Sequence, residues 1–431
     1  MDLLDRDLPR REYLKGAVAV GGAGALSACL DRAESDPIPT GDPGAKPAQQ
    51  HAWREYIRHD AAGNSQLPTH QVLLYLNLDG EGPPTSEQRE AVAASLTTLD
   101  RAYEWSHEGL LYSIAYSPAY FERFEASLPA TVDLPAPTSL SDFETPTFDT
   151  QDAVVHLASD RADAVLEAEE ALTGQQERVN GIDVEARLTD AFTVDSRRTG
   201  FVGAGLPAQN QNAAGIPDSK PVPEESPLFM GFIAGFVGNQ ATEEYVTLDE
   251  GPFAGGTTKA IANIRQRLDD WYGEQDYDER VMEMFSPVHA EEGLVEGVGA
   301  NLGDNSGIDE MLDDILDQAR EHARVGHAQK AARANRDDDG NVRLLRRHFE
   351  STDDIGSDQK VASLHFPSLQ RGISAFEEVR RAMNGTDVTA ATPAVRQRVN
   401  NGILEYIFTR RRGNFLVPPR RHRVLPSPRP T

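Results

Sequence analysis

The order of strands and helices in the first half of the chain constrains the fold most. Val72–Leu78 has the length and apolar composition of a buried strand, and Thr85 is placed to cap a helix that runs to about Tyr103. The next segments continue the alternation: a strand at Gly109–Tyr116, a strand at Ala153–Ala158, a helix at Asp160–Leu172 and a strand at Ile182–Leu188. This order predicts a ferredoxin-like unit. Because the order is common, it indicates no function by itself.

A histidine and a pair of arginines distinguish the second half of the chain. An apolar stripe at helical spacing comprises Ile308, Met311, Leu312, Ile315, Leu316 and Ala319. Its extension brings His327 onto the same inward side, and a strand-like run with Arg346 and Arg347 follows a polar loop. An imidazole can bind a transition metal or haem iron, and a buried guanidinium can lie over an iron-bound anion. His322 and His348 are alternative ligands, and a histidine near a helix end can also be a capping or packing residue.

The charge balance excludes one class of partner. The chain has 69 acidic and 42 basic residues, six of them Lys, and a net charge of -27. Such a composition is typical of proteins in high salt, where screening removes self-repulsion, and we interpret the protein as halophile-like. Phosphates would be repelled, so we expect no nucleic-acid partner. The single cysteine, Cys29, allows neither an internal disulfide nor a Cys-x-x-Cys-His haem attachment.

The first 29 residues resemble an export signal. Arg10 and Arg11 precede an apolar, glycine- and alanine-rich run, Gly16–Ala28, as in twin-arginine signals. Leu26–Cys29 resembles a lipobox with Cys29 as the lipidated residue. We therefore expect export by the twin-arginine route and an extracytoplasmic protein anchored to the cell membrane by lipid. A cytoplasmic amino-terminal helix is the alternative.

Two segments are predicted to lie outside the folded domains. Residues 30–66 begin with a Pro-, Ser- and Asp-rich stretch and are interpreted as a flexible linker. Residues 420–431 form a basic, Pro-rich tail. Together with Arg410, Arg411 and Arg412, this tail would make a positive cluster that can contact anionic lipid headgroups. The alternative is a disordered tail.

Five stretches between Gly231 and Pro419 follow the order of a known family. They are Gly231–Gly235, the strand and turn Gly255–Trp271, the helix Asp278–Phe285, His327 with the Arg346–Arg347 strand, and the closing segment Ile403–Pro419. This order resembles dye-decolourising (DyP-type) haem peroxidases. The resemblance implies an α+β fold of the dimeric α+β barrel type, in which two ferredoxin-like units, antiparallel sheets with flanking helices, pack together. It implies an N-terminal unit at 67–195 and a haem-binding C-terminal unit at 196–419.

The resemblance also implies a cofactor and a site. Non-covalent haem b would be ligated by His327, and Arg346 would be the catalytic residue on the distal face. The substrates would be hydrogen peroxide and an unknown reducing substrate, and a homo-oligomer is left open.

One position departs from the family pattern. The family has Gly-Phe-x-Asp-Gly over the distal haem face, and its Asp moves a proton during peroxide cleavage. In Gly231–Gly235, Ala234 replaces this Asp and is followed by Gly235; in the other glycine-rich piece, 200–205, Gly203 replaces it. Neither side chain can transfer a proton. The expected function is therefore a peroxidase with weakened acid–base chemistry; the alternatives are a haem or porphyrin carrier and a haem-free interaction module.

Overall fold

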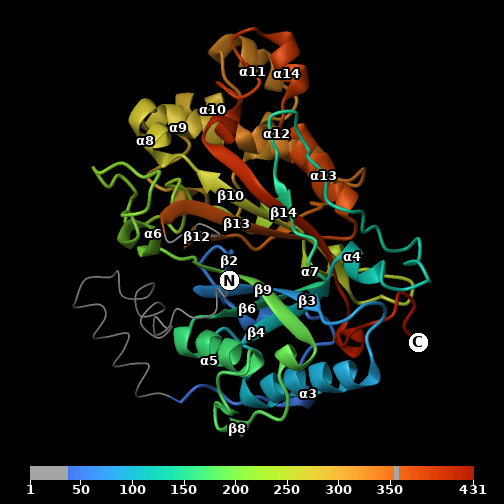
Figure 1. Ribbon diagram of the computed structural model, residues 1–431. Helices are drawn as coiled ribbons and strands as arrows, with labels where there is room; N and C mark the ends of the chain where they lie inside the picture. The colour runs from blue at the N-terminus through green and yellow to red at the C-terminus, as the bar shows by residue number, and fades with distance from the viewer. Residues whose placement is uncertain (1–36, 354–358) are drawn as a thin grey trace.

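The computed structural model describes residues 37–353 and 359–431. Its centre is a ten-stranded sheet (Figure 1). The strands are β3 (His70–Leu78), β4 (Leu111–Tyr116), β5 (Thr147–Phe148), β6 (Ala153–Ser159), β9 (Phe192–Phe201), β10 (Thr257–Gln266), β11 (Leu345–Arg346), β12 (Phe349–Asp353), β13 (Lys360–Gln370) and β14 (Ile407–Val417). Two separate pairs are β1 (Arg58–His59) with β2 (Ser65–Gln66), and β7 (Arg178–Val179) with β8 (Ile182–Asp183).

The sheet closes into a ring. The strand order β10-β13-β12-β9-β3-β6-β4-β14 returns to its start because β14 also pairs with β10. The first half of the chain supplies β3, β4, β6 and β9, and the second half supplies the other four. The halves meet where Glu350 pairs with Phe201 and where Leu416 pairs with Tyr116. Two four-stranded antiparallel units joined in this way confirm the expected α+β barrel.

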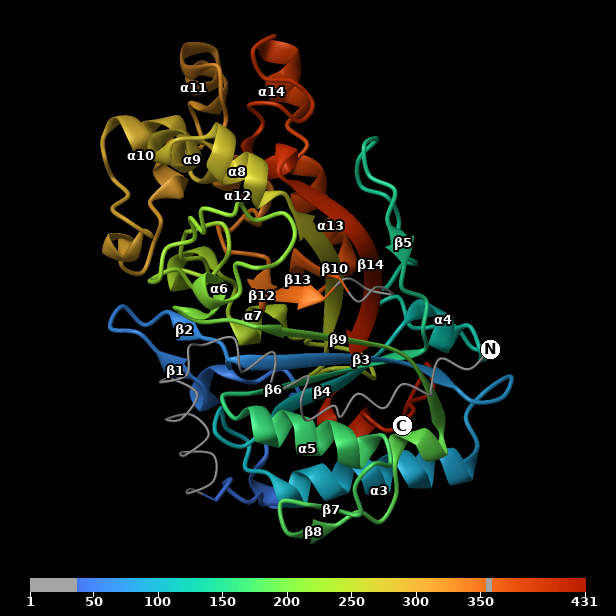
Figure 2. The same ribbon diagram turned by 60° about the vertical axis from the view of Figure 1, so that its left-hand side comes forward.

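Helices cover both outer sides of the ring (Figure 2). They are α3 (Ser86–Ala102), α4 (Pro118–Phe121), α5 (Ala162–Leu172), α6 (Leu206–Gln209), α7 (Glu243–Val246), α8 (Leu268–Glu274), α9 (Tyr277–Met284), α10 (Pro287–Glu291), α11 (Ile315–His322), α12 (His327–Ala334), α13 (Ile373–Ala382) and α14 (Thr386–Ala391). Figure 2 shows α3 and α5 below the N-terminal strands and α8 to α14 above the C-terminal strands. A capping box of Thr85 and Gln88 starts α3, which buries Val92, Leu96 and Leu99.

The inside of the ring is a separate core. Because side chains alternate along a strand, each strand sends one set inward and the other toward the helices. The inward set of both halves forms one apolar cluster: Leu73, Tyr75, Ala115, Val154, Ile261, Phe349, Leu369, Phe415 and Val417 with Ala241, Val246 and Val342. This shared core joins the two halves.

Three expected boundaries are corrected. The predicted strand Ile182–Leu188 contains only the short β8, and β9 is the fourth strand of the N-terminal unit. The expected domain boundary between residues 195 and 196 therefore falls inside a strand. The apolar stripe that begins at Ile308 also does not reach His327: α11 ends at His322, Ala323 adopts a left-handed conformation (φ 57°), and His327 starts a new helix.

The predicted linker and tail are packed into the fold where the structure describes them. Trp53 is 1% exposed, and the Gln50 side chain donates to the carbonyls of Ile114 and Pro418. At the other end, the Tyr116 hydroxyl donates to the Arg423 carbonyl, and Leu425 is fully buried. Burial of these apolar side chains outweighs the loose composition around them.

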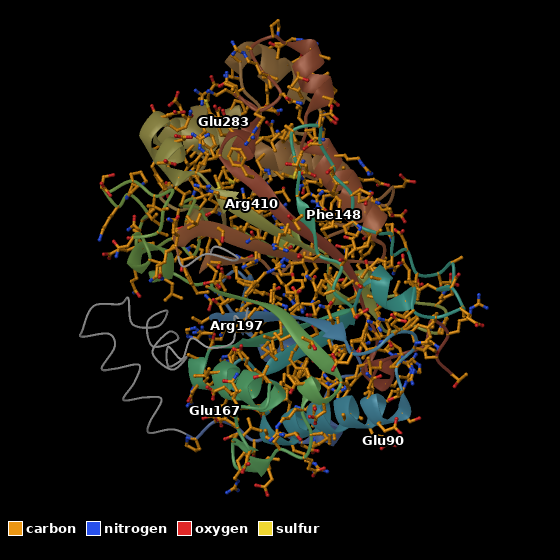
Figure 3. The ribbon with its side chains drawn as sticks, in the orientation of Figure 1. Glu90, Phe148, Glu167, Arg197, Glu283 and Arg410 are labelled. Carbon is orange, nitrogen blue, oxygen red and sulfur yellow. The ribbon has the colours of Figure 1, made fainter. Side chains whose placement is uncertain are left out.

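The expected positive cluster is also corrected. Arg412 is buried and pairs with Glu144, and Arg411 pairs with Asp149. Their charges are therefore neutralised within the fold, and only Arg410 of the three is exposed on β14 (Figure 3). Arg10, Arg11 and Cys29 lie outside the described residues. In residues 37–353 and 359–431, every helix is too short or too polar to cross a bilayer.

Asp100 holds the C-terminal segment in place, and its loss should destabilise the protein. It pairs with Arg423 and accepts the Tyr112 hydroxyl hydrogen bond at 2.7 Å. Asp100→Ala leaves a buried guanidinium without its partner, which we expect to lower the free energy of unfolding by about 3–5 kcal/mol. Urea unfolding followed by tryptophan fluorescence measures the loss. Asp183→Ala, which breaks the exposed pair with Arg178, is the control and should change the free energy of unfolding by about 1 kcal/mol at most. Equal losses in the two variants would contradict the anchoring role.

Candidate functional site

The backbone at His327 is held between two neighbouring segments. Gly326 lies so close to Phe285 that a Cβ at Gly326 would be 1.8 Å from the Phe285 carbonyl oxygen. A Cβ at Gly402 would lie 2.8 Å from the His327 nitrogen. Only glycine permits both approaches, because any larger residue would push the segments apart. The start of α12 is therefore fixed in position.

The first turn of α12 is anchored by buried polar contacts. The Lys330 ammonium donates at 2.6 Å to both the carbonyl and the side-chain oxygen of Asn401, the residue before Gly402. Glu283 of α9, in the upper helical layer (Figure 3), is also buried, and burial raises the pKa of its carboxyl to about 8. Burial lowers the pKa of Lys330 to about 7. At these pKa values the Glu283 carboxyl is mostly protonated at neutral pH, so the Asn401 contacts hold Lys330 in place.

The His327 ring is deep in the protein but keeps accessible surface. Burial, together with the charges of Lys330, Arg346 and Arg380, lowers its pKa to about 3. Among the described residues, neither ring nitrogen has a hydrogen-bond partner. The residue is therefore partly accessible although its ring is desolvated. At neutral pH this ring is neutral, which is the form that binds a metal ion.

Arg346 is a partly buried cation without an anionic partner among the described residues. Its guanidinium reaches the Gln240 side-chain oxygen at 3.2 Å and the Asn239 carbonyl at 3.5 Å. No carboxylate in the described residues forms an ion pair with it, and burial lowers its pKa to about 10. Its neighbour Arg347 differs, because it pairs with Glu243 at 2.5 Å. A desolvated cation without a counter-ion is costly, so this position favours an anionic ligand.

The strand register places Arg346 on the face beneath the helices. Arg346 pairs with Ser368, and Leu345 pairs with Leu369, which belongs to the core inside the ring. Arg346 therefore points outward. Phe366 and, from α12, Ala331 and Ala334 pack against a large apolar core that includes Ala260 of β10 and Ile373, Phe376 and Val379 of α13. Helix α12 with His327 thus lies over the face that carries Arg346.

The central strands are not fully covered on this face. Ile264, Leu364 and Phe366 keep accessible surface although each lies on a strand with neighbours on both sides. The helical layer lies above this part of the sheet (Figure 2). Apolar walls with one unpartnered imidazole and one unpaired guanidinium suit a flat apolar group that carries a metal and binds an anion. Haem fits these residues.

The glycine-rich loop Gly231–Gly235 lies next to Gln240, whose side chain contacts Arg346. The Gln240 side chain accepts from the Arg346 backbone nitrogen at 2.9 Å and donates to the Arg346 carbonyl at 3.3 Å. A Cβ at Gly235 (φ 88°) would lie 3.3 Å from the Gln240 nitrogen. Ala234, which directly precedes Gly235, is exposed. Of the two glycine-rich pieces, 231–235 is thus the one connected to Arg346. No sequence signal pointed to Gln240, because its contacts depend on the loop conformation.

The two alternative histidines have different surroundings. His322 ends α11 and lies 3.5 Å from Glu291 of α10, within the helical layer. His348 is 7% exposed and stacks on Phe366, with ring centroids 5.9 Å apart. It therefore lies on the same face as Arg346, whereas no contact connects His322 with that face.

Comparisons with known proteins support the fold. The model of a family of unknown function (DUF7405) matches residues 68–419. No curated protein matches the chain. Among solved structures, the chain is similar to DyPB from Rhodococcus jostii RHA1, with 15% identity, a TM-score of 0.51 and coverage of 83% of this chain and 95% of that chain.

Two further structures agree. A dye-decolorizing peroxidase from Bacteroides thetaiotaomicron has 14% identity and a TM-score of 0.51, with 85% and 97% of the two chains covered. The encapsulated DyP-type peroxidase from Mycobacterium smegmatis has 13% identity and a TM-score of 0.50, with 82% and 94% covered. At these identities the likeness shows the fold alone: the chain has the fold of dye-decolourising peroxidases.

Glu350 should make stability depend on pH. It is fully buried, one carboxylate oxygen has no hydrogen-bond partner, and burial raises its pKa from 4.5 to about 8. Between these values the folded state holds a proton that the unfolded chain releases, so stability falls as pH rises from 4.5 to 8. Glu350→Gln resembles the protonated carboxyl and removes this loss. We expect it to be about 2–4 kcal/mol more stable than the parent at pH 8 and equal to it near pH 4.5.

Urea unfolding at the two pH values tests this expectation. Glu90→Gln on the exposed surface of α3 (Figure 3) is the control and should follow the parent at both. A Glu350→Gln protein whose advantage is the same at pH 4.5 and pH 8 would show that the buried carboxyl does not titrate in this range.

Proposed function

Because the chain belongs to the DUF7405 family, a family of unknown function, we propose its function from the site: a haem protein that acts as a peroxidase. The proposal rests on two groups. His327, at the start of α12, is neutral and has no hydrogen-bond partner among the described residues, and Arg346, on the sheet beneath the helices, has no ion-pair partner among them. The charge of Arg346 is one of the causes that lower the pKa of His327. The fold shared with dye-decolourising peroxidases supports this reading.

Haem b would be held without a covalent bond. His327 would ligate the iron through a ring nitrogen, and the apolar side chains of Phe366 and Leu364 would contact the porphyrin. Bound haem supplies the redox chemistry with hydrogen peroxide, and an unknown reducing substrate would return the electrons. Gly326 and Gly402, with the Lys330–Asn401 contacts, keep the imidazole in one orientation. Little conformational entropy would therefore be lost when it binds the iron.

Arg346 would act on the oxidant. With a pKa of about 10 it stays charged at neutral pH, and Gln240 fixes its position. A fixed cation stabilises negative charge that develops on peroxide oxygen, and the low dielectric around it strengthens the effect. Ala234 cannot hold or move a proton, so the acid–base part of the reaction is weakened.

Ala234 also favours a second candidate function. A haem or porphyrin carrier needs the ligand and the apolar walls but no proton transfer. Both functions suit a protein outside the cytoplasm. We propose export through Arg10 and Arg11 and lipid anchoring through Cys29, on the sequence pattern alone.

Haem binding should depend on His327. Protein expressed with haem available and purified in high salt should show a Soret band. His327→Ala should lose it while its circular dichroism spectrum stays unchanged, because the iron loses its protein ligand. His322→Ala is the matched control and should retain the band. A folded parent protein without a Soret band would favour the haem-free interaction module.

Peroxidase turnover should depend on Arg346. Replacing it with alanine removes the positive charge next to the reacting oxygen, and kcat/KM for hydrogen peroxide should fall about 10²–10³-fold. Arg343→Ala is the control: its guanidinium lies 2.5 Å from Glu378 on the outer surface, so turnover should be unchanged. A haem-loaded parent protein that leaves peroxide unconsumed would instead identify a carrier.

A further inference from the structure

His348 lies on the outer face of the ring, two residues after Arg346. Arg346 pairs with Ser368, and Phe349 pairs with His365, so the same register sets His348 opposite Phe366. The two rings are stacked, with an interplanar angle of 15°. Alternate residues on one strand face are separated by about 7 Å. The imidazole therefore lies beside the guanidinium, under the same helices.

The His348 ring has an unused polar atom. It is 7% exposed, and its buried Nδ1 has no hydrogen-bond partner among the residues that the structure describes. Buried polar atoms in folded proteins are nearly all hydrogen-bonded, so an unpartnered ring nitrogen beside an unpaired cation points to a polar ligand. The same face contains Glu350, whose second carboxylate oxygen also lacks a partner. Three polar groups in one row along β11 and β12 are thus incompletely satisfied.

We propose that His348 is the proton acceptor of this site and performs the proton transfer that Ala234 cannot. The inference rests on the proposed function. A hydrogen peroxide molecule beside Arg346 gives one O–H proton to an imidazole nitrogen of His348. The O–H electron pair stays on oxygen, an N–H bond forms, and the products are a hydroperoxide anion and an imidazolium.

The charges around His348 favour this transfer only when an anion forms. Burial and the charge of Arg346 lower the pKa of His348 to about 3, so the ring is neutral at physiological pH and ready to accept. An imidazolium alone would be repelled by the guanidinium. A hydroperoxide anion next to both cations offsets this repulsion, so proton transfer and anion formation are coupled.

His365 provides a matched control within the same sheet. It too is fully buried, has an unpartnered ring nitrogen (Nε2), and has a pKa lowered to about 3 by burial. His365 pairs with Phe349 across the strands, and the centroids of the two aromatic rings are 5.2 Å apart. Both side chains lie inside the closed sheet. The two histidines therefore differ mainly in the face on which they lie.

The test uses hydrogen cyanide, which must lose a proton to bind haem as an anion. The full-length parent, His348→Gln and His365→Gln are loaded with haem, and the association rate constant for cyanide is measured from the Soret change at neutral pH. We expect His348→Gln to lower this constant by about 100-fold or more, with haem affinity within a few-fold of the parent. His365→Gln should stay within about threefold. His348→Asn gives the same comparison if the Gln variant does not fold.

The outcomes separate this inference from the proposed function. Haem-loaded His348→Gln with the parent rate for cyanide overturns the role of His348 and leaves the haem protein intact. Loss of haem in His348→Gln together with retention in His327→Ala makes His348 the iron ligand and overturns the inference too. A parent protein that binds no haem overturns the proposed function and the inference together.

Discussion

Closure of the sheet into a ring is the constraint on which the structure depends. Strand pairing at β12–β9 and β14–β4 joins the two halves and gives every strand an inner and an outer face. The neighbours Arg346 and Arg347 therefore enter different environments. Arg347 points inward, where it forms an ion pair with Glu243 and lies over the Trp53 ring. Arg346 points outward beneath α12. A register shift of one residue would exchange them, so the register also decides which arginine can serve the site.

Charge neutralisation separates the site from the rest of the interior. The fully buried Arg198 pairs with Asp149, and Arg412 pairs with Glu144. Within residues 37–353 and 359–431, the Lys259 ammonium has only Ser113 and His156 as side-chain neighbours within hydrogen-bond reach, and burial lowers its pKa to about 7. A lysine can thus release its proton, but an arginine cannot at physiological pH. Arg346 is left as a permanent, partly buried charge, and an anionic ligand would offset its desolvation.

Close backbone approaches give the site its rigidity. Gly326 and Gly402 let two segments press against the start of α12, and the Lys330–Asn401 contacts hold them together. Chains that are 13–15% identical share the fold because apolar alternation and a few such close approaches can be met by many sequences. The chemistry we propose depends instead on single positions, among them Ala234 and His348.

The sequence alone determined the features that depend on nearby residues. Apolar runs predicted β3, β6 and β10, a capping signal predicted α3, and the ordered motifs predicted the α+β barrel and named His327 and Arg346. The tertiary structure decided what depends on distant contacts: the helix break at Ala323, β9 as the fourth strand, the packing of Trp53 and Leu425, and the hold of Gln240 on Arg346. Local patterns carry no information about these contacts, since each is stabilised by residues far away in the chain.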